Sequence, residues 1–208
     1  YRECLKVNPH HDGVFVDFIG TFCNRRLFDE AHKEIDDRMS LFPNDAPAFT
    51  ARAWVLKFQS RLPEAIETLD KALVLQPNHV SNLLTMARFL ESGDRQKANE
   101  YLRRAVTASN RSLRTLSRLC NSLNRSRYGS EAGHIQEGYE IACEIVDKFP
   151  QRALLAEADT PRDLFLRCID YERINALPDH KTLMRHWIDE GRIEPLWISL
   201  GRVKTYED

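Results

Sequence analysis

Two aromatic residues near the middle of the sequence are spaced for binding. Trp54 and Phe58 are four positions apart, so on a helix both side chains lie on one face. Large aromatic side chains are the usual anchors for a bound peptide. The alternative is that the two rings pack against neighbouring helices. The spacing itself is compatible with both interpretations.

A second candidate is a run of arginines. Residues 101–130 contain seven arginines and neither lysine nor an acid. Arg114, Arg118 and Arg125 recur at helical spacing, which predicts a positive stripe along one helix. Arginine suits the recognition of carboxylate or phosphate because its guanidinium donates two parallel hydrogen bonds. The alternative is a solvated face, neutralised by the Asp and Glu residues of 29–37 or by another copy of the chain.

The histidines and cysteines show no pattern typical of catalysis or of a metal site. His180 and His186 are six positions apart, which places them on different faces of a helix. Five cysteines without a CxxC pair favour free thiols in a reducing compartment, and hence a cytoplasmic protein. Cys168 lies on an apolar helix face, where a core position is more common than a nucleophile. We therefore expect no enzyme, no metal and no cofactor.

The elements that must position these side chains recur along the chain. The recurring residues are Pro9, Pro43 and Pro77, 34 residues apart, and Ala31, Ala65 and Ala98, 34 and then 33 apart. Residues 46–77 have two stretches of helical period around a polar turn, and Ala65 lets the second helix approach the first closely. Pro77 ends the second helix. Such a hairpin cannot bury both of its apolar faces alone, so it needs neighbours of its own kind.

With this period the sequence resembles the tetratricopeptide repeat family, whose unit is a helical hairpin of 34 residues. The residues that carry the resemblance are Phe49, Ala53, Leu56, Ala65, Leu69, Ala72 and Pro77 in residues 46–78, then Phe15, Ile19, Phe22, Ala31, Ile35 and Pro43 in 12–44, and Leu83, Ala87, Leu90, Ala98, Leu102 and Ala105 in 80–110. Arg38 stands where the first repeat would have its second small residue. The resemblance covers roughly residues 1–150 and implies an all-α, right-handed solenoid.

The changes in spacing along the chain suggest its organisation. We expect repeats at about 12–44, 46–78 and 80–110, and a divergent fourth repeat at 113–150 that contains a long loop. Residues 1–11 have the pattern of the end of a preceding repeat, so we expect the chain to begin inside a longer protein. Residues 151–208 depart from the repeat spacing and are expected to form a helical C-terminal cap, or else a second interaction module.

The resemblance also implies which residues line a concave groove, because in the family the first helix of each repeat faces it. The implied positions are Val16, Asp17, Gly20 and Asn24, then Thr50, Ala51, Trp54 and Phe58, then Ser81, Leu84, Thr85, Arg88 and Glu91, and finally Arg114, Ser117, Arg118, Asn121 and Arg125. Among these, the candidate peptide-binding residues are Trp54, Phe58, Arg88, Arg114, Arg118, Asn121 and Arg125.

Taken together, these patterns favour a non-catalytic scaffold that binds a peptide or protein segment. Family members that grip a chaperone's C-terminal carboxylate use a set of Lys and Asn residues, and here Val16, Gly20 and Ala51 occupy corresponding positions. A more general acidic or phosphorylated segment is therefore the expected partner. One alternative is the regulatory or substrate-presenting portion of an enzyme whose catalytic domain lies outside this sequence.

A further alternative is that the arginine stripe binds RNA phosphates. The net charge of −1 provides no general attraction to nucleic acid or to anionic lipid, so neither is the partner that we expect. The sequence has no run of about 18 apolar residues, which also argues against a membrane span.

Overall fold

The computed structural model describes residues 12–124, together with Cys4, Val7 and positions 137, 138, 140, 141, 144, 145 and 148. Residues 12–124 form helices joined by short turns, without a strand. The helices are α2 (Asp12–Asn24), α3 (Phe28–Leu41), α4 (Ala46–Phe58), α5 (Leu62–Leu75), α6 (Val80–Leu90), α7 (Arg95–Ala108) and α8 (Leu113–Asn124). The first six of these helices fall in pairs within the expected repeats at 12–44, 46–78 and 80–110.

The chain divides into two compact units, residues 1–108 and 109–208. The predicted loop after α8, the cap at 151–208, most of the helix that would complete the fourth repeat, and all but two residues of 1–11 lie outside the described residues. They stay predictions. None of the helices described is long and apolar enough to span a bilayer.

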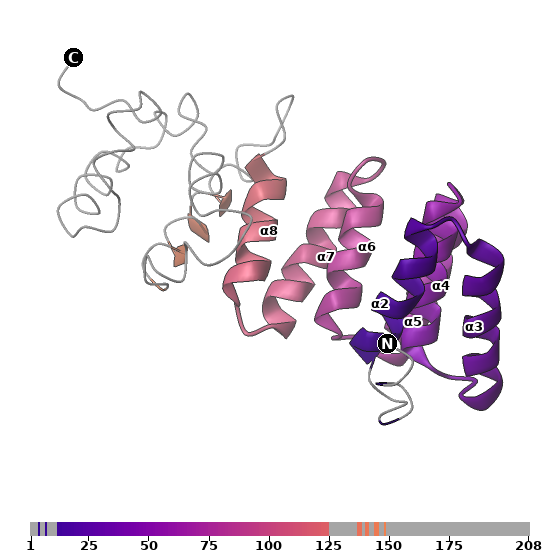
Figure 1. Ribbon diagram of the computed structural model, residues 1–208. Coiled ribbons are helices and arrows are strands. Elements are labelled where there is room, and N and C mark those ends of the chain that lie inside the picture. Colours follow the sequence, from indigo (N-terminus) through magenta and orange to yellow (C-terminus); the bar gives the residue numbers. More distant parts are fainter. Residues whose placement is uncertain are drawn as a thin grey trace, which may run out of the picture. The chain divides into compact units, whose positions relative to one another are not determined.

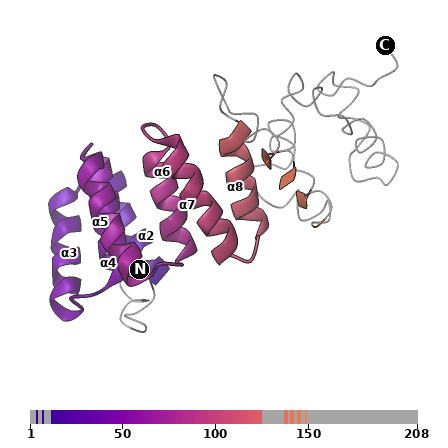
Figure 2. The ribbon, with the colours of Figure 1, turned by 180° about the vertical axis from the view of Figure 1, so that it is seen from behind.

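The first unit is built from three consecutive hairpins, α2–α3, α4–α5 and α6–α7, whose helices run in opposite directions (Figure 1; seen from behind in Figure 2). Helix α4 packs against α2, α3 and α5, and α6 packs against α5 and α7. Ala31, Ala65 and Ala98 lie near the starts of α3, α5 and α7, and each is at most 1% exposed. A side chain this small lets the two helices of a hairpin come close, as the repeat pattern predicts.

Between α2, α3 and α4 lies an apolar core. Its members are Phe15, Phe18, Ile19 and Cys23 from α2, Ala31 and Ile35 from α3, and Ala48, Ala51 and Val55 from α4. Each helix contributes a stripe at spacings of three and four residues, so the core is continuous across the boundary between the first two hairpins. This shared core explains why one hairpin needs the next.

The turns inside the first two hairpins have the same geometry. Arg26 and Ser60, 34 residues apart, both adopt a left-handed backbone with φ of 59° and 64°. In each turn the amide of the following residue donates to the carbonyl five positions back, at 3.0 Å and 2.9 Å. These bonds satisfy carbonyls at the helix end that would otherwise lack a partner. The repeat therefore extends to backbone conformation.

Arg38, which departs from the repeat pattern, is held by a nearly buried ion pair. Its Nε donates to Asp45 Oδ2 at 2.5 Å and its Nη2 to Asp45 Oδ1 at 3.1 Å. Asp45 in turn caps α4 by accepting from the Ala48 amide at 3.0 Å, and the guanidinium lies 4.3 Å from the centre of the Phe15 ring. One arginine thus connects α2, α3 and the first turn of α4.

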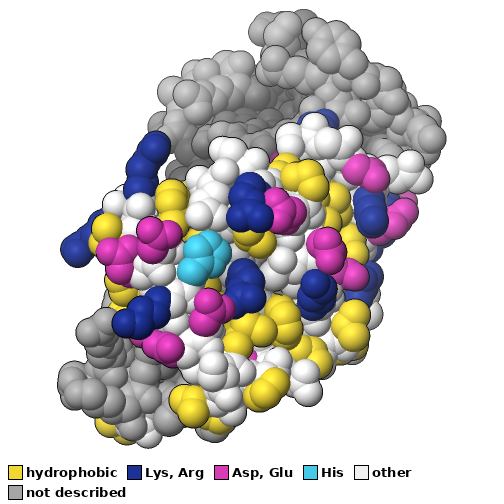
Figure 3. All heavy atoms as spheres, turned by 90° about the vertical axis from the view of Figure 1, so that its right-hand side faces the viewer, with side chains coloured by type: hydrophobic (Ala, Val, Ile, Leu, Met, Phe, Trp, Pro, Cys, Tyr) yellow, Lys and Arg dark blue, Asp and Glu magenta, His cyan; other side chains and the backbone are white. Residues whose placement is uncertain are grey.

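Much of the outer surface has charges of both signs. Figure 3 looks from the α3 side of Figure 1 and shows, on the described part of that face, Lys and Arg side chains interleaved with Asp and Glu. Outward ion pairs of α3, α4 and α5 include Asp36 with Arg52, Glu64 with Arg61, and Glu67 with Lys71. Exposed pairs of this kind add little stability, but they leave this surface without a patch of a single sign.

Replacement of Arg38 tests its role in joining the hairpins. We expect Arg38→Ala to lower the free energy of unfolding by about 3–5 kcal/mol, because it leaves the Asp45 carboxylate nearly buried without its counter-ion. Urea unfolding followed by circular dichroism measures the loss. Arg95→Ala is the matched control, since Arg95 is exposed and should change stability by less than about 0.5 kcal/mol. A loss below about 1 kcal/mol for Arg38→Ala would contradict this role.

Candidate functional site

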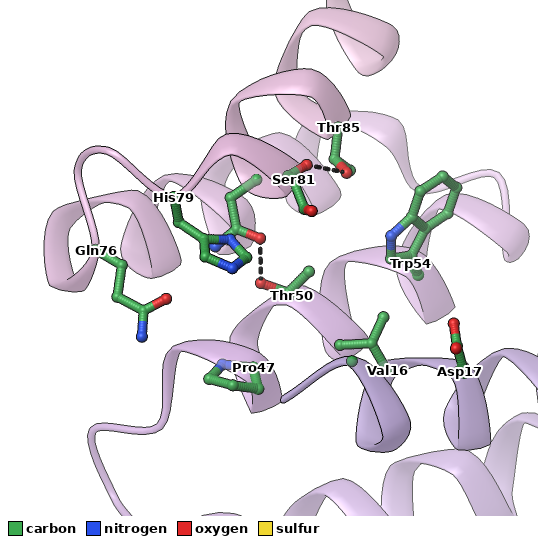
Figure 4. Close-up of a pocket in the computed structure, with 11 residues that line it drawn as sticks. Val16, Asp17, Pro47, Thr50, Trp54, Gln76, His79, Ser81 and Thr85 are labelled. Carbon is green, nitrogen blue, oxygen red and sulfur yellow. Dashed lines mark hydrogen bonds between the residues drawn. The ribbon is translucent and has the colours of Figure 1, made fainter. Parts of the chain in front are cut away.

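A cleft lined by both polar and apolar side chains opens between the first helices of the three hairpins, with a volume of about 240 Å³. The residues that line it are Gly13, Val16 and Asp17 of α2, Pro47, Thr50 and Trp54 of α4, Gln76 and His79 of the connection between α5 and α6, and Ser81, Asn82 and Thr85 of α6. Figure 4 shows Val16, Pro47 and Trp54 on one side and Gln76, His79 and Ser81 on the other. We call this site the α2–α4–α6 cleft.

The floor of the cleft is a buried hydrogen bond between two helices. Thr50 Oγ1 of α4 lies 3.0 Å from Asn82 Oδ1 of α6 and 3.0 Å from the carbonyl oxygen of Ala46 (Figure 4). Asn82 is 1% exposed and Thr50 is 6% exposed. A buried polar pair of this kind favours one register of its two helices, because another register would leave the buried amide oxygen of Asn82 without this partner. It therefore holds α4 and α6 in the positions that shape the cleft.

Trp54 is the largest side chain on the wall of the cleft. Its ring centre lies 5.2 Å from that of Phe89 of α6, edge to face, and 6.4 Å from that of Phe58 one turn along α4. Phe89 is buried, whereas Phe58 is 45% exposed. The structure therefore combines the two interpretations of the aromatic pair. Trp54 packs against a neighbouring helix and also faces the cleft.

Two cations border the Trp54 ring. The guanidinium carbon of Arg88 lies 5.5 Å from the ring centre, and Lys57 Nζ lies 5.5 Å from the ring centres of both Trp54 and Phe58. These distances are within the range of cation–π attraction. Within the part of the chain that the structure describes, neither Arg88 nor Lys57 forms an ion pair. Their charges remain available to a ligand.

Six of the groove positions implied by the resemblance line the cleft together. They are Val16, Asp17, Thr50, Trp54, Ser81 and Thr85. Phe58 and Arg88 adjoin Trp54, as described above. Ala51 differs from the expectation, because it is fully buried in the core beside α2.

Five lining residues were not among the groove positions implied by the resemblance: Gly13, Pro47, Gln76, His79 and Asn82. Pro47 could have been found by extending the Thr50–Trp54 stripe back by one turn. Gln76 and His79 belong to the connection between hairpins, for which helical spacing predicts nothing. Asn82 lines the cleft beside its bonding partner Thr50, which is 32 positions away in the sequence. Local spacing does not indicate such a contact.

The arginine run divides into bound and unbound members. Arg104 donates to the carbonyl oxygen of Pro77 at 3.2 Å and stacks on Tyr101. Arg111 has a left-handed backbone with φ of 56° and binds both carboxylate oxygens of Glu144. Arg111 is thus neutralised by an acid, as the alternative interpretation expects, whereas Arg104 is held by a carbonyl and an aromatic ring. Neither belongs to a free stripe.

Arg114 and Arg118 are exposed on α8, in the second unit, and neither has an ion pair among the described residues. Ser117 and Asn121 of the same helix are partly exposed. The buried side of α8 carries Leu116, Leu119, Cys120 and Leu123. Asn121 Oδ1 is buried without a hydrogen-bond partner. Arg125, the remaining member of the predicted stripe, lies outside the described residues.

The buried cysteine of the first unit has no sign of reactivity. Cys23 is 1% exposed in the core of the first two hairpins, and burial raises the pKa of its thiol because the thiolate would lose its hydration. The described residues contain no group of three His, Cys, Asp or Glu side chains that could hold a metal ion.

Comparison with solved structures identifies the fold. The chain is similar to a putative kinesin light chain from Podosopora anserina with nearly identical tetratricopeptide-like repeats, at a TM-score of 0.58 and 14% identity, covering 94% of this chain and 99% of that one. It is similar to MamA from Desulfovibrio magneticus RS-1, at a TM-score of 0.56 and 17% identity, covering 86% and 92%.

A third similar structure is YrrB, a tetratricopeptide repeat protein with an unusual peptide-binding site, at a TM-score of 0.54 and 15% identity, covering 89% and 96%. No family model and no curated protein matches the sequence. The predicted fold, an all-α solenoid of tetratricopeptide-like hairpins, is thus confirmed.

The pair of Arg111 and Glu144 makes stability depend on pH. The hydrogen bonds from Arg111 hold the pKa of Glu144 below its ordinary value of 4.5. A carboxyl with a lowered pKa in the folded state stabilises the protein above its unfolded pKa, and this contribution is lost as the pH falls through the folded pKa. We expect Glu144→Gln to lower the free energy of unfolding by less than about 1 kcal/mol, because the pair is partly exposed.

Urea unfolding of the wild type and Glu144→Gln at a series of pH values measures this difference. It should be constant above about pH 5 and shrink as the pH falls below 4.5, the ordinary value. A difference that does not change over this range would show that the pair is not formed in solution.

Proposed function

We propose that the α2–α4–α6 cleft and the adjoining aromatic side chains bind an extended segment of another protein, and that the chain is a non-catalytic interaction scaffold. The observation that carries this proposal is Trp54, whose indole lines an open cleft with two unpaired cations beside it. The fold supports it at a coarser level, since YrrB, which has the same fold, has a peptide-binding site.

Trp54 has the surroundings of a binding anchor. Its edge-to-face contact with Phe89 supports the ring from one side, so little side-chain freedom remains to be lost when a ligand arrives. Phe58 extends the apolar surface by one turn of α4. An apolar side chain of the bound segment can therefore cover Trp54 and Phe58 together.

The charges near Trp54 favour an acidic neighbour for that apolar side chain. Arg88 and Lys57 both approach the indole of Trp54, and neither has an ion pair among the described residues. A carboxylate or phosphate beside either cation would accept charge-assisted hydrogen bonds. We therefore place an acidic or phosphorylated residue of the ligand beside Arg88.

The exposed face of α8 supplies a second set of groups for acidic ligands in the other unit. Arg114 and Arg118 are one turn apart, and the unpartnered amide oxygen of Asn121 marks a side chain whose hydrogen bonds are incomplete. If the amide is turned by half a rotation, its NH₂ group becomes a donor at this position. We propose that Arg114, Arg118 and Asn121, with Arg125 beyond them, contact acidic groups of a bound protein.

The proposal is tested with a library of random short peptides displayed on phage and selected on the purified chain. We expect enrichment of peptides that combine a large apolar residue with Asp or Glu. Synthetic versions should bind Trp54→Ala at least about 30-fold more weakly, because an anchor residue contributes about 2 kcal/mol or more. Fluorescence anisotropy of labelled peptides measures the affinities.

A second variant avoids any effect on packing. Arg88 is exposed, and Arg88→Glu should weaken the same peptides by about tenfold through charge repulsion, whereas Arg95→Glu on α7 should leave their affinity unchanged. Equal affinity for the wild type, Trp54→Ala and Arg88→Glu would contradict the proposal. So would a polyuridine RNA that binds more tightly than any selected peptide and displaces it.

A further inference from the structure

The α2–α4–α6 cleft itself carries the opposite charge to the cations beside Trp54. Apart from His79, Asp17 is the only acidic or basic side chain among the described residues that line it. Asp17 is exposed and has neither a hydrogen bond nor an ion pair within the helices that the structure describes. Figure 4 shows Asp17 and Trp54 on the same side of the view, and both line the cleft. The cleft therefore offers an unneutralised negative charge.

The hydroxyl groups of the cleft also favour a ligand that donates hydrogen bonds. The hydroxyl of Thr85 donates to the carbonyl oxygen of Ser81 at 2.7 Å. The hydroxyl of Thr50 donates to the carbonyl oxygen of Ala46 or to Oδ1 of Asn82. Both oxygens keep lone pairs but have no second proton to donate. While these bonds are kept, the hydroxyls of Thr50 and Thr85 can only accept a hydrogen bond from a ligand.

His79 adds an unsatisfied atom to the same cleft. Its Nδ1 is buried and has no hydrogen-bond partner among the described residues. Buried polar atoms are nearly always paired in folded proteins, so this atom needs a partner that water or a donor group of a ligand can supply. In the neutral ring with the proton on Nε2, Nδ1 accepts a hydrogen bond. It matches the acceptor character of the hydroxyls.

The size and apolar parts of the cleft indicate one long side chain. The cleft volume of about 240 Å³ is below the range of roughly 300–1,000 Å³ that is usual for pockets that hold a whole small molecule. Val16, Pro47 and Trp54 form an apolar wall beside these acceptors. A lysine or arginine places an aliphatic stem along such a wall and a charged donor at its end.

We propose that the α2–α4–α6 cleft receives a lysine or arginine side chain of the bound segment, with Asp17 as its counter-ion. This inference rests on the proposed function, because the basic residue belongs to the same peptide that covers Trp54. The ligand is then bipolar rather than uniformly acidic. A basic residue lies at Asp17, an apolar residue at Trp54 and Phe58, and an acidic residue at Arg88 and Lys57. Opposite charges at two sites fix the direction of the segment across the helices.

Selection of the displayed peptide library on charge-reversed variants tests this proposal. On the wild type we expect enriched peptides to contain Lys or Arg as well as Asp or Glu. Asp17→Lys should remove the preference for Lys or Arg and weaken the wild-type peptides by at least about tenfold, since it places like charges together. Asp70→Lys on α5 is the matched control, because Asp70 is equally exposed and unpaired among the described residues. It should select the same peptides as the wild type.

The outcomes separate the two proposals. If enriched peptides depend on Trp54 but lack Lys or Arg, or if Asp17→Lys selects the same peptides as the wild type, the basic-residue pocket is overturned while the peptide-binding face stands. If no peptide is enriched on the wild type, or if Trp54→Ala selects the same set, both proposals fail. A circular dichroism spectrum of each variant matching that of the wild type shows that the helices are retained.

Discussion

The structure depends on the close approach of two helices at a buried alanine. Ala31, Ala65 and Ala98 are fully or almost fully buried where the second helix of each hairpin begins. Because a hairpin closed in this way still exposes an apolar face, it is stable only against the next hairpin, and the core shared by α2, α3 and α4 is the result. The same constraint leaves the first helices beside one another on one surface. The cleft is a consequence of how the hairpins stack.

Within this frame, function follows from which charges the fold leaves unpaired. Arg38, Arg52 and Arg111 all have carboxylate partners, and they serve the structure. Arg88, Lys57 and Asp17 have none among the described residues, although all three lie at or near Trp54. A buried or paired charge contributes to the fold, whereas an unpaired charge next to an aromatic surface gains most from a ligand. This contrast is the physical basis for assigning the binding face.

Most of the helical architecture could be predicted from sequence, because it depends on local spacing. Helix α3 lies within the first expected repeat, residues 12–44, and six of the implied groove positions meet in the cleft. The rest depends on contacts between distant side chains. The composition of residues 101–130 put Arg104 and Arg111 in the arginine run but could not show that Pro77 and Glu144 bind them. The resemblance to the family implied that Ala51 faces the groove, whereas the packing of α2 against α4 buries it.

The central claim is that ligands bind the first helices of the hairpins rather than the second. Nuclear magnetic resonance of the ¹⁵N-labelled chain during titration with a selected peptide tests it most directly. The account predicts that the indole resonance of Trp54 and the amides of Asp17, Thr85 and Arg88 shift together, with one dissociation constant. Shifts confined to α3, α5 and α7, with the Trp54 indole unchanged, would contradict it.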